Sequence, residues 1–242
     1  MLIYCHIKLF QITILENYRL MTNYRVTLRE IYNKLDRTFG PQNWWPGETP
    51  LEIIIGAILT QNTSWHNVEK AIIALYKDNH LTPHALKTIP VKTLSLLIRS
   101  AGYHNVKAGR LKNFISFLYS EYNGSIKTMA KERTKTLRKK LLGVKGIGPE
   151  TADSILLYAL EKPVFVVDAY TRRILGRHNL LGYQSDYNSI QDLFTRNLKK
   201  SVKLFNQYHA LLVKLGKEYC RPTPRCSGCP LEKYGNKLAT SR

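Results

Sequence analysis

Acidic side chains are scarce in this chain of 242 residues. Its 17 Asp and Glu residues stand against 37 Lys and Arg residues, which gives a formal net charge of +20. A deficit of negative charge on this scale indicates a polyanionic partner, most simply a nucleic acid. A basic protein that is merely soluble would have the same composition, so charge alone does not separate the two interpretations.

Long apolar runs are also lacking. Residues 1–15 are apolar, but this segment is too short to cross a bilayer and is interrupted by Lys8. No basic segment precedes it and no small-residue cleavage site follows it, which argues against a signal peptide. Residues 1–20 are therefore interpreted as a dispensable extension, with Met1 or Met21 as the start. A cytoplasmic protein with no membrane contact and no structural disulfides is expected.

Alternating strand patterns are nearly absent, and PVFVVD (163–168) is the one short run that resembles a strand. Apolar residues recur instead at helical spacing, with turn residues between the periodic segments. Helices are expected at residues 25–39, 50–62, 64–77 (with Ser64 as N-cap), 83–88, 91–100, 105–120, 125–130, 134–142, 149–160, 168–178, 187–199 and 203–217. The sequence therefore predicts an all-α fold.

Residues 144–153, VKGIGPETAD, predict a tight turn between two helices. Gly143 is expected to cap the first helix at its C-terminus. Gly146 and Gly148 permit positive φ angles and let a phosphate come close to bare backbone. Ile147, between these two glycines, is expected to plug into the core between the helices.

This arrangement is a helix-hairpin-helix, which grips the DNA backbone without reading its sequence. Pro149 begins the second helix, where its missing N–H costs nothing and the exposed N–H groups favour an anion. An ordinary corner between two helices with a glycine cap is the alternative. A basic run supports the DNA interpretation, although it would serve equally as a solvated face. Its members are Lys131, Arg133, Lys135, Arg138, Lys139 and Lys140, with Lys145 on the turn itself.

Asp168 follows four apolar residues directly and stands at the start of an expected helix. An aspartate in this place is most often an N-cap. A carboxylate bordered by Val166 and Val167 would also be partly desolvated, which suits stabilisation of a cationic centre or activation of a water. The residue by itself favours the cap.

The hairpin, the eighteen-residue step from Glu150 to Asp168, and VVDAYTRRI together resemble the helix-hairpin-helix DNA glycosylases of the endonuclease III superfamily. GAILTQNTSWHNVEKAI (56–72) is similar to that family's early helix, in which a glutamine approaches the DNA. The resemblance covers residues 25–230. It implies a two-lobed helical fold, a nucleoid-associated monomer, and double-stranded DNA with damaged bases as partner. It also implies that Asp168 is catalytic, stabilising an oxocarbenium-like sugar and directing water to it.

Glu150 stands where bifunctional members of that family have a lysine. The lysine attacks the sugar, forms a Schiff base and leads to strand cleavage, which a glutamate cannot do. Lys145, five residues earlier on the other side of the turn, is not expected to substitute. The resemblance therefore implies a monofunctional glycosylase that leaves an abasic site with little lyase activity. A side chain that simply faces solvent is the alternative for Glu150.

Trp44, Trp45 and Trp65 are the three tryptophans, and core packing is the ordinary use of such residues. The polar, turn-rich context QNWWPG is a poor one for two core indoles. The arrangement is similar to the bacterial 3-methyladenine DNA glycosylases of the endonuclease III type, whose aromatic residues line the base pocket and which have a glutamate in the lysine's place. Indole faces attract the positive charge of alkylated purines. Gln61 or Asn62 would fill the space left by the flipped base.

Cys220, Cys226 and Cys229 have a ligand-like spacing near the C-terminus. Relatives of endonuclease III close such a loop with a fourth cysteine around a [4Fe–4S] cluster. Here no cysteine or histidine follows in PLEKYGNKLATSR, the first gap is one residue short, and Cys5 lies in the extension. Three interpretations stay open: a cluster with an outside ligand, a metal-free remnant, or zinc or another metal.

The resemblance divides the chain into a lobe of residues 48–162, which ends in the hairpin, and a lobe of residues 21–47 with 163–242. DNA is expected in a cleft with Asp168 and the hairpin on opposite walls. The residues expected at the DNA are Gln61, Asn62, Lys145, Gly146, Ile147, Gly148, Glu150 and Thr151. The alternatives are an endonuclease III-like glycosylase and AP lyase acting on oxidised pyrimidines, or a non-catalytic DNA-binding protein.

Overall fold

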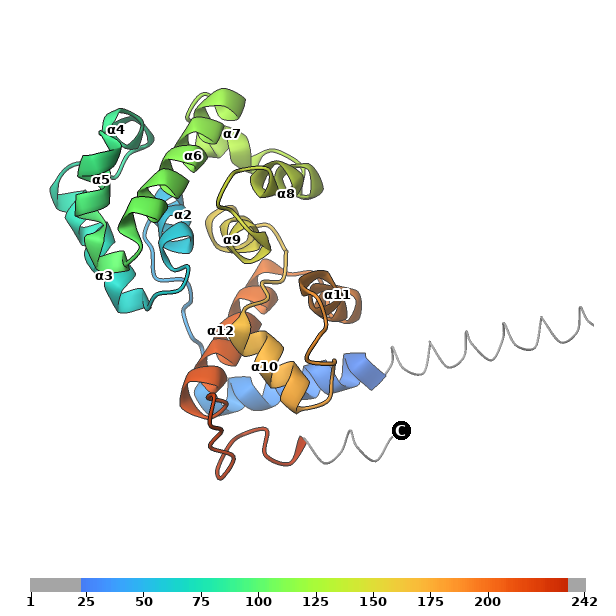
Figure 1. Cartoon of the computed structure of the whole chain (residues 1–242). Coiled ribbons are helices and arrows are strands. Elements are labelled where there is room, and N and C mark those ends of the chain that lie inside the picture. Colours follow the sequence, from blue (N-terminus) through green and yellow to red (C-terminus); the bar gives the residue numbers. More distant parts are fainter. Residues whose placement is uncertain (1–22, 235–242) are drawn as a thin grey trace, which may run out of the picture. The chain divides into compact units, whose positions relative to one another are not determined.

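The computed structural model describes residues 23–234. The expected extension at residues 1–20, with the two candidate start residues and Cys5, lies outside this range. All regular structure between residues 23 and 234 is helical, and no strand occurs there (Figure 1). The prediction of an all-α fold is therefore confirmed.

The described helices begin with residues 23–39 and lie close to the expected ranges. They continue with α2 (Pro50–Leu59), α3 (Trp65–Lys77), α4 (Pro83–Thr88), α5 (Val91–Leu97), the 3-10 turn η1 (Arg99–Ala101), α6 (His104–Tyr122), α7 (Ile126–Ala130), α8 (Thr134–Leu142), α9 (Pro149–Ser154), the π-helical turn η2 (Ile155–Ala159), α10 (Ala169–Arg177), α11 (Tyr187–Asn197) and α12 (Val202–Glu218). Within the described range, no helix is both long and apolar enough to span a membrane.

Two local predictions differ from the structure. The strand-like run 163–168 is an irregular, largely buried connection, because no partner strand exists among residues 23–234 to pair with its backbone. The single helix expected over 149–160 changes from α to π geometry at Ile155, where Leu160 N–H bonds to the Ile155 carbonyl at 3.1 Å. π turns of this kind recur at functional sites.

The chain divides into two compact units. The central unit is Trp45–Val166, and the terminal unit joins Met1–Trp44 to Val167–Arg242. The central unit contains the hairpin turn, Trp45 and Trp65, whereas the terminal unit contains Trp44, Asp168 and the three C-terminal cysteines.

Helix α2 is the buried centre of the central unit. Thr49 and Glu52 form a capping box at its start, with the Thr49 hydroxyl accepting the Glu52 N–H at 3.2 Å and Glu52 Oε2 accepting the Thr49 N–H at 2.9 Å. Ile54 and Ile58 are fully buried, and α2 packs against α3, α6, α9 and η2. The end of α2 is thereby brought to the second helix of the hairpin.

Lys107 on α6 fixes the C-terminal end of α2. Its side chain is buried, and Nζ donates to the carbonyls of Leu59 at 2.9 Å and Ala101 at 2.7 Å. Burial, aided by the charge of Arg110, lowers the pKa of Lys107. An ammonium at the last carbonyl of a helix complements its negative end, so Lys107 holds the segment that leads to Gln61.

The described part of the terminal unit contains the helix of residues 23–39 together with α10, α11 and α12, and α10 packs on α12. The buried Tyr208 hydroxyl on α12 donates to the Leu28 carbonyl at 2.9 Å, and Gln207 Nε2 donates to Asp36 Oδ1 at 2.7 Å. These bonds tie the N-terminal helix to α12. Helix α12 also packs against α10.

Candidate nucleic-acid interface and active site

The predicted Gly-Ile-Gly turn connects α8 to α9, as expected for a helix-hairpin-helix. Gly143 is the C-cap of α8 but has right-handed geometry (φ −77°), and Gly146 alone of the turn glycines has a positive φ, +98°. A Cβ on Gly146 would overlap the Arg110 side chain, whereas one on Gly148 would meet nothing within 4 Å. Ile147 is buried, as predicted for a core plug. Gly148 therefore leaves open backbone at the start of α9.

Gln61, near the beginning of the α2–α3 connection, binds the turn directly. Its Nε2 donates to the Gly146 carbonyl at 3.1 Å and to Thr151 Oγ1 at 2.8 Å, and its Oε1 accepts from Arg110. The structure thus brings together Gln61, Gly146 and Thr151, which were predicted separately from segments 85 or more residues apart. Thr151 is buried under this contact, whereas Asn62 is exposed with a positive φ of 55°.

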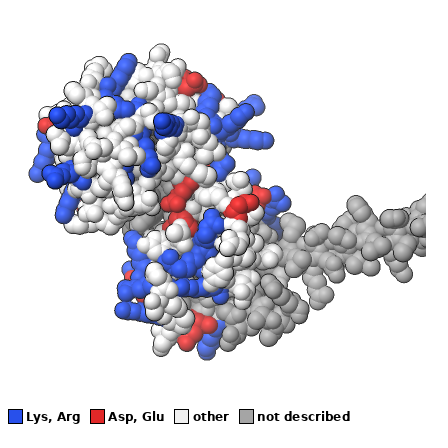
Figure 2. Space-filling model, in the orientation of Figure 1, with Lys and Arg blue, Asp and Glu red and all other residues white. Residues whose placement is uncertain are grey.

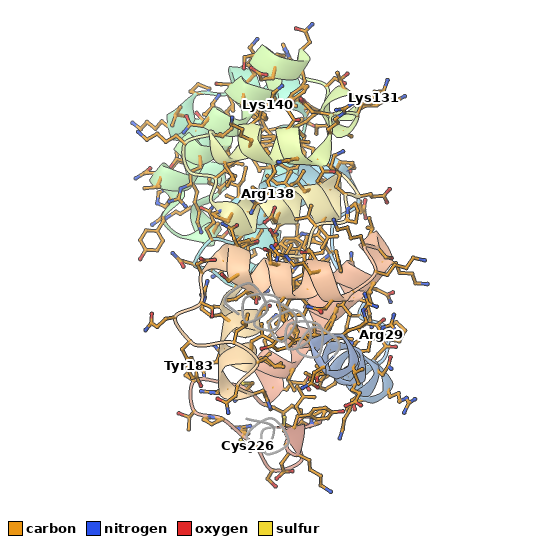
Figure 3. All side chains as sticks on the ribbon, turned by 90° about the vertical axis from the view of Figure 1, so that its right-hand side faces the viewer. Arg29, Lys131, Arg138, Lys140, Tyr183 and Cys226 are labelled. Carbon is orange, nitrogen blue, oxygen red and sulfur yellow. The ribbon has the colours of Figure 1, made fainter. Side chains whose placement is uncertain are left out.

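The basic run before the turn has two different kinds of member. Arg138 pairs in bidentate fashion with the fully buried Asp153, at 2.7 and 2.9 Å, and so links α8 to α9. Lys140 Nζ lies 3.0 Å from Glu132 and 3.1 Å from Glu121 (Figure 3 labels Lys131, Arg138 and Lys140). The exposed members are Lys131, Arg133, Lys135, Lys139 and, on the turn, Lys145. These five retain side chains directed to solvent that suit phosphate contacts.

Positive charge is widespread on the molecular surface. Lys and Arg side chains spread over the face shown in Figure 2, and Asp and Glu side chains are sparse on it. A distributed positive field attracts the phosphate backbone and does not depend on base sequence. This agrees with the net charge of +20.

Asp168 is both the N-cap of α10 and a member of a buried charge pair. Its Oδ1 accepts the Thr171 N–H at 2.7 Å, and its Oδ2 lies 3.6 Å from Nε2 of His209 on α12. Burial alone would raise the pKa of Asp168, but the charge of nearby His209 and the hydrogen bond from the Thr171 N–H outweigh burial and hold the pKa below its usual value. The carboxylate is therefore ionised at neutral pH although only 11% of its side chain is exposed.

Two of the three tryptophans gather with a tyrosine that the sequence reasoning missed. The Trp45 ring lies edge-on to Trp65 at 5.4 Å and tilted against Tyr158 at 5.0 Å. Gly56 makes room for them, because a Cβ there would come within 3.3 Å of both indoles. Tyr158 belongs to the π turn η2, and the signal in the sequence was a lone aromatic within ILLYAL.

Trp44 belongs to the terminal unit and has a different neighbour. Lys217 Nζ of α12 lies over its ring at 5.7 Å from the centroid, a cation–π contact. Trp44 thus belongs to one unit and Trp45 and Trp65 to the other, and a base pocket shared by all three stays a prediction. Adjacent residues in QNWWPG direct their rings into different units, which no spacing argument could show.

Glu150 lies exposed in the first turn of α9, and Lys145 lies exposed on the turn before it. A carboxylate in a first helical turn complements the positive end of the helix. The Glu150 side chain has no nucleophilic amine. This side chain therefore differs in charge and chemistry from the lysine that the resemblance leads one to compare with it.

The three cysteines of the C-terminal loop have different surroundings, and whether the loop binds a cluster stays a prediction. Cys220 is buried and its Sγ accepts from Arg177 Nη1 at 3.3 Å, Cys226 is exposed (Figure 3), and Cys229 is half-buried with its pKa raised, chiefly by burial. Across residues 23–234, no group of three Cys, His, Asp or Glu side chains is placed to hold a metal ion. Arginines bind this segment instead: Arg177 donates to the Arg221 and Pro222 carbonyls at 2.5 and 2.7 Å.

Two named proteins resemble this chain in sequence. It is 44% identical over 207 residues to the protein named "Putative DNA repair glycosylase MJ1434" of Methanocaldococcus jannaschii, across 85% of this chain and 94% of that protein. It is 30% identical over 214 residues to endonuclease III of Sulfolobus acidocaldarius, across 86% and 91% of the two chains.

Solved structures resemble it in fold. One is the crystal structure of the H. pylori 3-methyladenine DNA glycosylase (MagIII) bound to 1,N6-ethenoadenine, with a TM-score of 0.68, 27% identity, and coverage of 82% of this chain and 97% of that one. Another is a trapped endonuclease III–DNA covalent intermediate, with a TM-score of 0.76, 21% identity, and coverage of 89% and 98%. At 21% identity, the second likeness shows the fold alone.

The family model described as "HhH-GPD superfamily base excision DNA repair protein" matches residues 55–200, a range that includes the hairpin and Asp168. This match spans more than half of the chain and agrees with the sequence relatives and with the helical fold. The resemblance drawn from the motifs is therefore confirmed: the chain belongs to the HhH-GPD superfamily of base excision DNA repair proteins and is a DNA glycosylase.

Proposed function

We propose that this glycosylase removes alkylated purines, 3-methyladenine foremost, from duplex DNA by hydrolysis and leaves the strand uncut. The observation that carries the proposal is the cluster of Trp45, Trp65 and Tyr158 in the central unit. The likeness to a 3-methyladenine glycosylase at 27% identity supports it.

The aromatic cluster suits a cationic base. An alkylated purine carries positive charge, and electron-rich ring faces attract cations by about 0.5–2 kcal/mol, more when water is excluded. A flipped base must also be held once it has left the stack, and stacking on aromatic rings does this without base-specific hydrogen bonds. A pocket of this kind therefore selects for charge and shape.

Asp168 suits the hydrolytic step. Departure of the base leaves positive charge on the sugar, and an ionised carboxylate stabilises that charge and directs a water to C1′. A cationic base is a good leaving group, so little acid catalysis is needed. The low pKa of Asp168, held down by His209 against burial, keeps the required charge in place.

Glu150 accounts for the absence of strand cleavage in the proposal. A lyase needs an amine that forms a Schiff base with the sugar, and Glu150 has none. Lys145 is exposed on the other side of the turn, and Lys107 is buried with Nζ engaged by two carbonyls. The product is therefore an intact strand with an abasic site.

The test is base release from methylated duplex DNA, with strand nicks scored before and after alkali. We expect free 3-methyladenine, nicks only after alkali, and no complex trapped by borohydride. Asp168→Asn should abolish release while duplex binding is retained. Nicks without alkali would contradict the monofunctional assignment and favour the endonuclease III-like alternative.

Glu150→Lys sharpens the same test. Introducing the missing amine should produce nicks without alkali and a borohydride-trapped complex, while the matched variant Glu150→Gln should produce neither. If Glu150→Gln nicks as much as Glu150→Lys, another residue is the nucleophile.

The pocket is tested by comparing two tryptophans. Trp65→Leu should lower release of cationic 3-methyladenine about tenfold, the equivalent of about 1.4 kcal/mol, and lower release of a neutral damaged base less. Trp44→Leu is the comparison, because its ring already contacts Lys217 in the terminal unit. Equal losses for both bases with Trp65→Leu would argue against selection by charge.

A further inference from the structure

His209 is a buried histidine beside the proposed catalytic carboxylate. It lies in the middle of α12, is 4% exposed, and faces Asp168 across the packed pair α10 and α12. Its Nε2 is 3.6 Å from Asp168 Oδ2. Both residues belong to the terminal unit, so the arrangement is set by the fold of that unit alone.

The two oxygens of Asp168 have different partners. Oδ1 accepts the Thr171 N–H as an N-cap at 2.7 Å, and Oδ2 faces His209. Thr171 is itself fully buried in the first turn of α10. One contact therefore fixes the carboxylate to its own helix, and the other fixes its rotation against a neighbouring helix.

The charge balance at Asp168 depends on the histidine. Burial is the largest single influence on the pKa of Asp168 and raises it, whereas the charge of His209 and then the hydrogen bond from the Thr171 N–H lower it. The net direction is downward. Without the histidine, only Thr171 would remain among these influences to oppose the desolvation of a buried carboxylate.

Several other titratable groups on the elements packed here have partners of their own. The Tyr208 hydroxyl donates to the Leu28 carbonyl, and the Tyr187 hydroxyl accepts the Val167 N–H at 3.3 Å. On α10, the Arg172 and Arg173 guanidinium groups donate to the carbonyls of Ser185 and Cys220. His209 is thus the group on these helices whose charge acts on Asp168.

We propose that His209 is a positioning residue of the glycosylase reaction, which orients Oδ2 of Asp168 and keeps that carboxylate ionised for the oxocarbenium-like sugar. The inference rests on the proposed role of Asp168. A neutral or rotated carboxyl group would neither stabilise the sugar cation nor accept a proton from the attacking water. His209 acts through Asp168 and does not need to touch the DNA.

The kinetic test compares His209→Leu, His209→Asn and the control His178→Asn, which alters another histidine of the terminal unit at the far end of α10. Single-turnover release from methylated duplex DNA is measured between pH 5 and 8. In His209→Leu we expect at least a tenfold slower reaction at pH 7 and an acid limb displaced upward by about one pH unit or more. Affinity for a duplex with an abasic-site analogue should stay within twofold.

His209→Asn keeps an N–H donor and should retain most of the rate with a smaller displacement of the acid limb. His178→Asn should follow the wild-type profile. A His209→Leu profile with the wild-type shape would overturn the inference, and so would a loss confined to DNA affinity.

A second readout is independent of substrate. Carbon-13 NMR of labelled aspartate carboxyls, assigned with Asp168→Asn, reports the Asp168 pKa directly. It should rise in His209→Leu, and an unchanged value would overturn the inference. If wild-type protein releases no base from methylated DNA, the proposed substrate fails, and the NMR titration still decides the role of His209. If His209→Leu does not fold by circular dichroism, the titration of His209→Asn against wild type decides.

Discussion

The hairpin turn and the C-terminal cysteine loop are both short, basic, turn-rich segments. They differ in which of their groups are bound by side chains from other parts of the chain. At the hairpin, Gln61 and Arg110 bind the inner side of the turn, and Gly148 leaves the backbone open. At the cysteine loop, Arg177 occupies the carbonyls and a thiol of the loop itself.

The two segments therefore differ in how closely the contacts around their motif residues follow the pattern of the motif. The hairpin residues that the motif demands are engaged as the motif predicts, with Ile147 buried and Gly146 at positive φ. The cysteines have a ligand-like spacing, but one is buried against Arg177 and another is exposed.

The largest expected effect is on the ion pair behind the hairpin. Arg138→Met leaves the fully buried Asp153 without its bidentate partner, and breaking such a pair costs about 3 kcal/mol. Urea denaturation should show this loss, with DNA affinity reduced as α8 and α9 lose their register. Lys135→Met, an exposed neighbour on α8, should change stability by less than about 0.5 kcal/mol. Equal stability of the two variants would contradict the bracing role of Arg138.

The next largest effect on stability is expected at Gly146, and the second glycine of the turn, Gly148, provides the comparison. Gly146→Ala forces a Cβ into a positive φ and into Arg110, at a cost of about 1–3 kcal/mol. Gly148→Ala meets open space at ordinary φ and should leave the melting temperature unchanged while weakening DNA binding. Thermal melts and fluorescence anisotropy with duplex DNA measure both. A stable Gly146→Ala protein would show that the strain assigned to this turn is absent.

A smaller effect is expected when the arginine of the cysteine loop is removed. Arg177→Met deletes bonds to the Arg221 and Pro222 carbonyls and to Cys220 Sγ, worth about 1–2 kcal/mol together because the site is partly exposed. Faster proteolysis within residues 220–230 should accompany the loss. Unchanged proteolysis would mean that the loop is held by other contacts.

The smallest effect is expected for the exposed thiol. Cys226→Ser should change stability by less than about 0.5 kcal/mol, because Cys226 is exposed and the described loop forms no metal-binding group. Iron analysis and the visible spectrum of protein purified without oxygen provide the measurement. Stoichiometric iron that is lost in Cys226→Ser would favour a cluster with an outside ligand over a metal-free loop.

Helical periodicity and caps located the helices well, because each depends on nearby residues. The helices at Pro83–Thr88 and Thr134–Leu142 have the expected bounds. Errors occurred where packing decided: η2 changes helical geometry within an unbroken apolar run, and residues 163–168 lack a strand partner within the described range. Neither feature is visible in a local pattern.

The candidate site shows the same limit. Asp168 and the turn were identified from spacing and resemblance, and their roles at DNA stay predictions. The bonds from Gln61 to the turn, the pairing of Arg138 with Asp153, and the addition of Tyr158 to two tryptophans join segments distant in the chain. Contacts between such distant segments cannot be inferred from the local patterns of a single sequence.

The sequence by itself determined the positive charge, the all-helical class, the hairpin and the family, because these follow from composition and from local spacing. The tertiary structure decided which basic residues pair with buried carboxylates, which tryptophans share a cluster, and that a histidine 41 residues beyond Asp168 lies beside its carboxylate. The physical reason is that burial, and with it the strength of every charge contact, arises only when distant helices pack together.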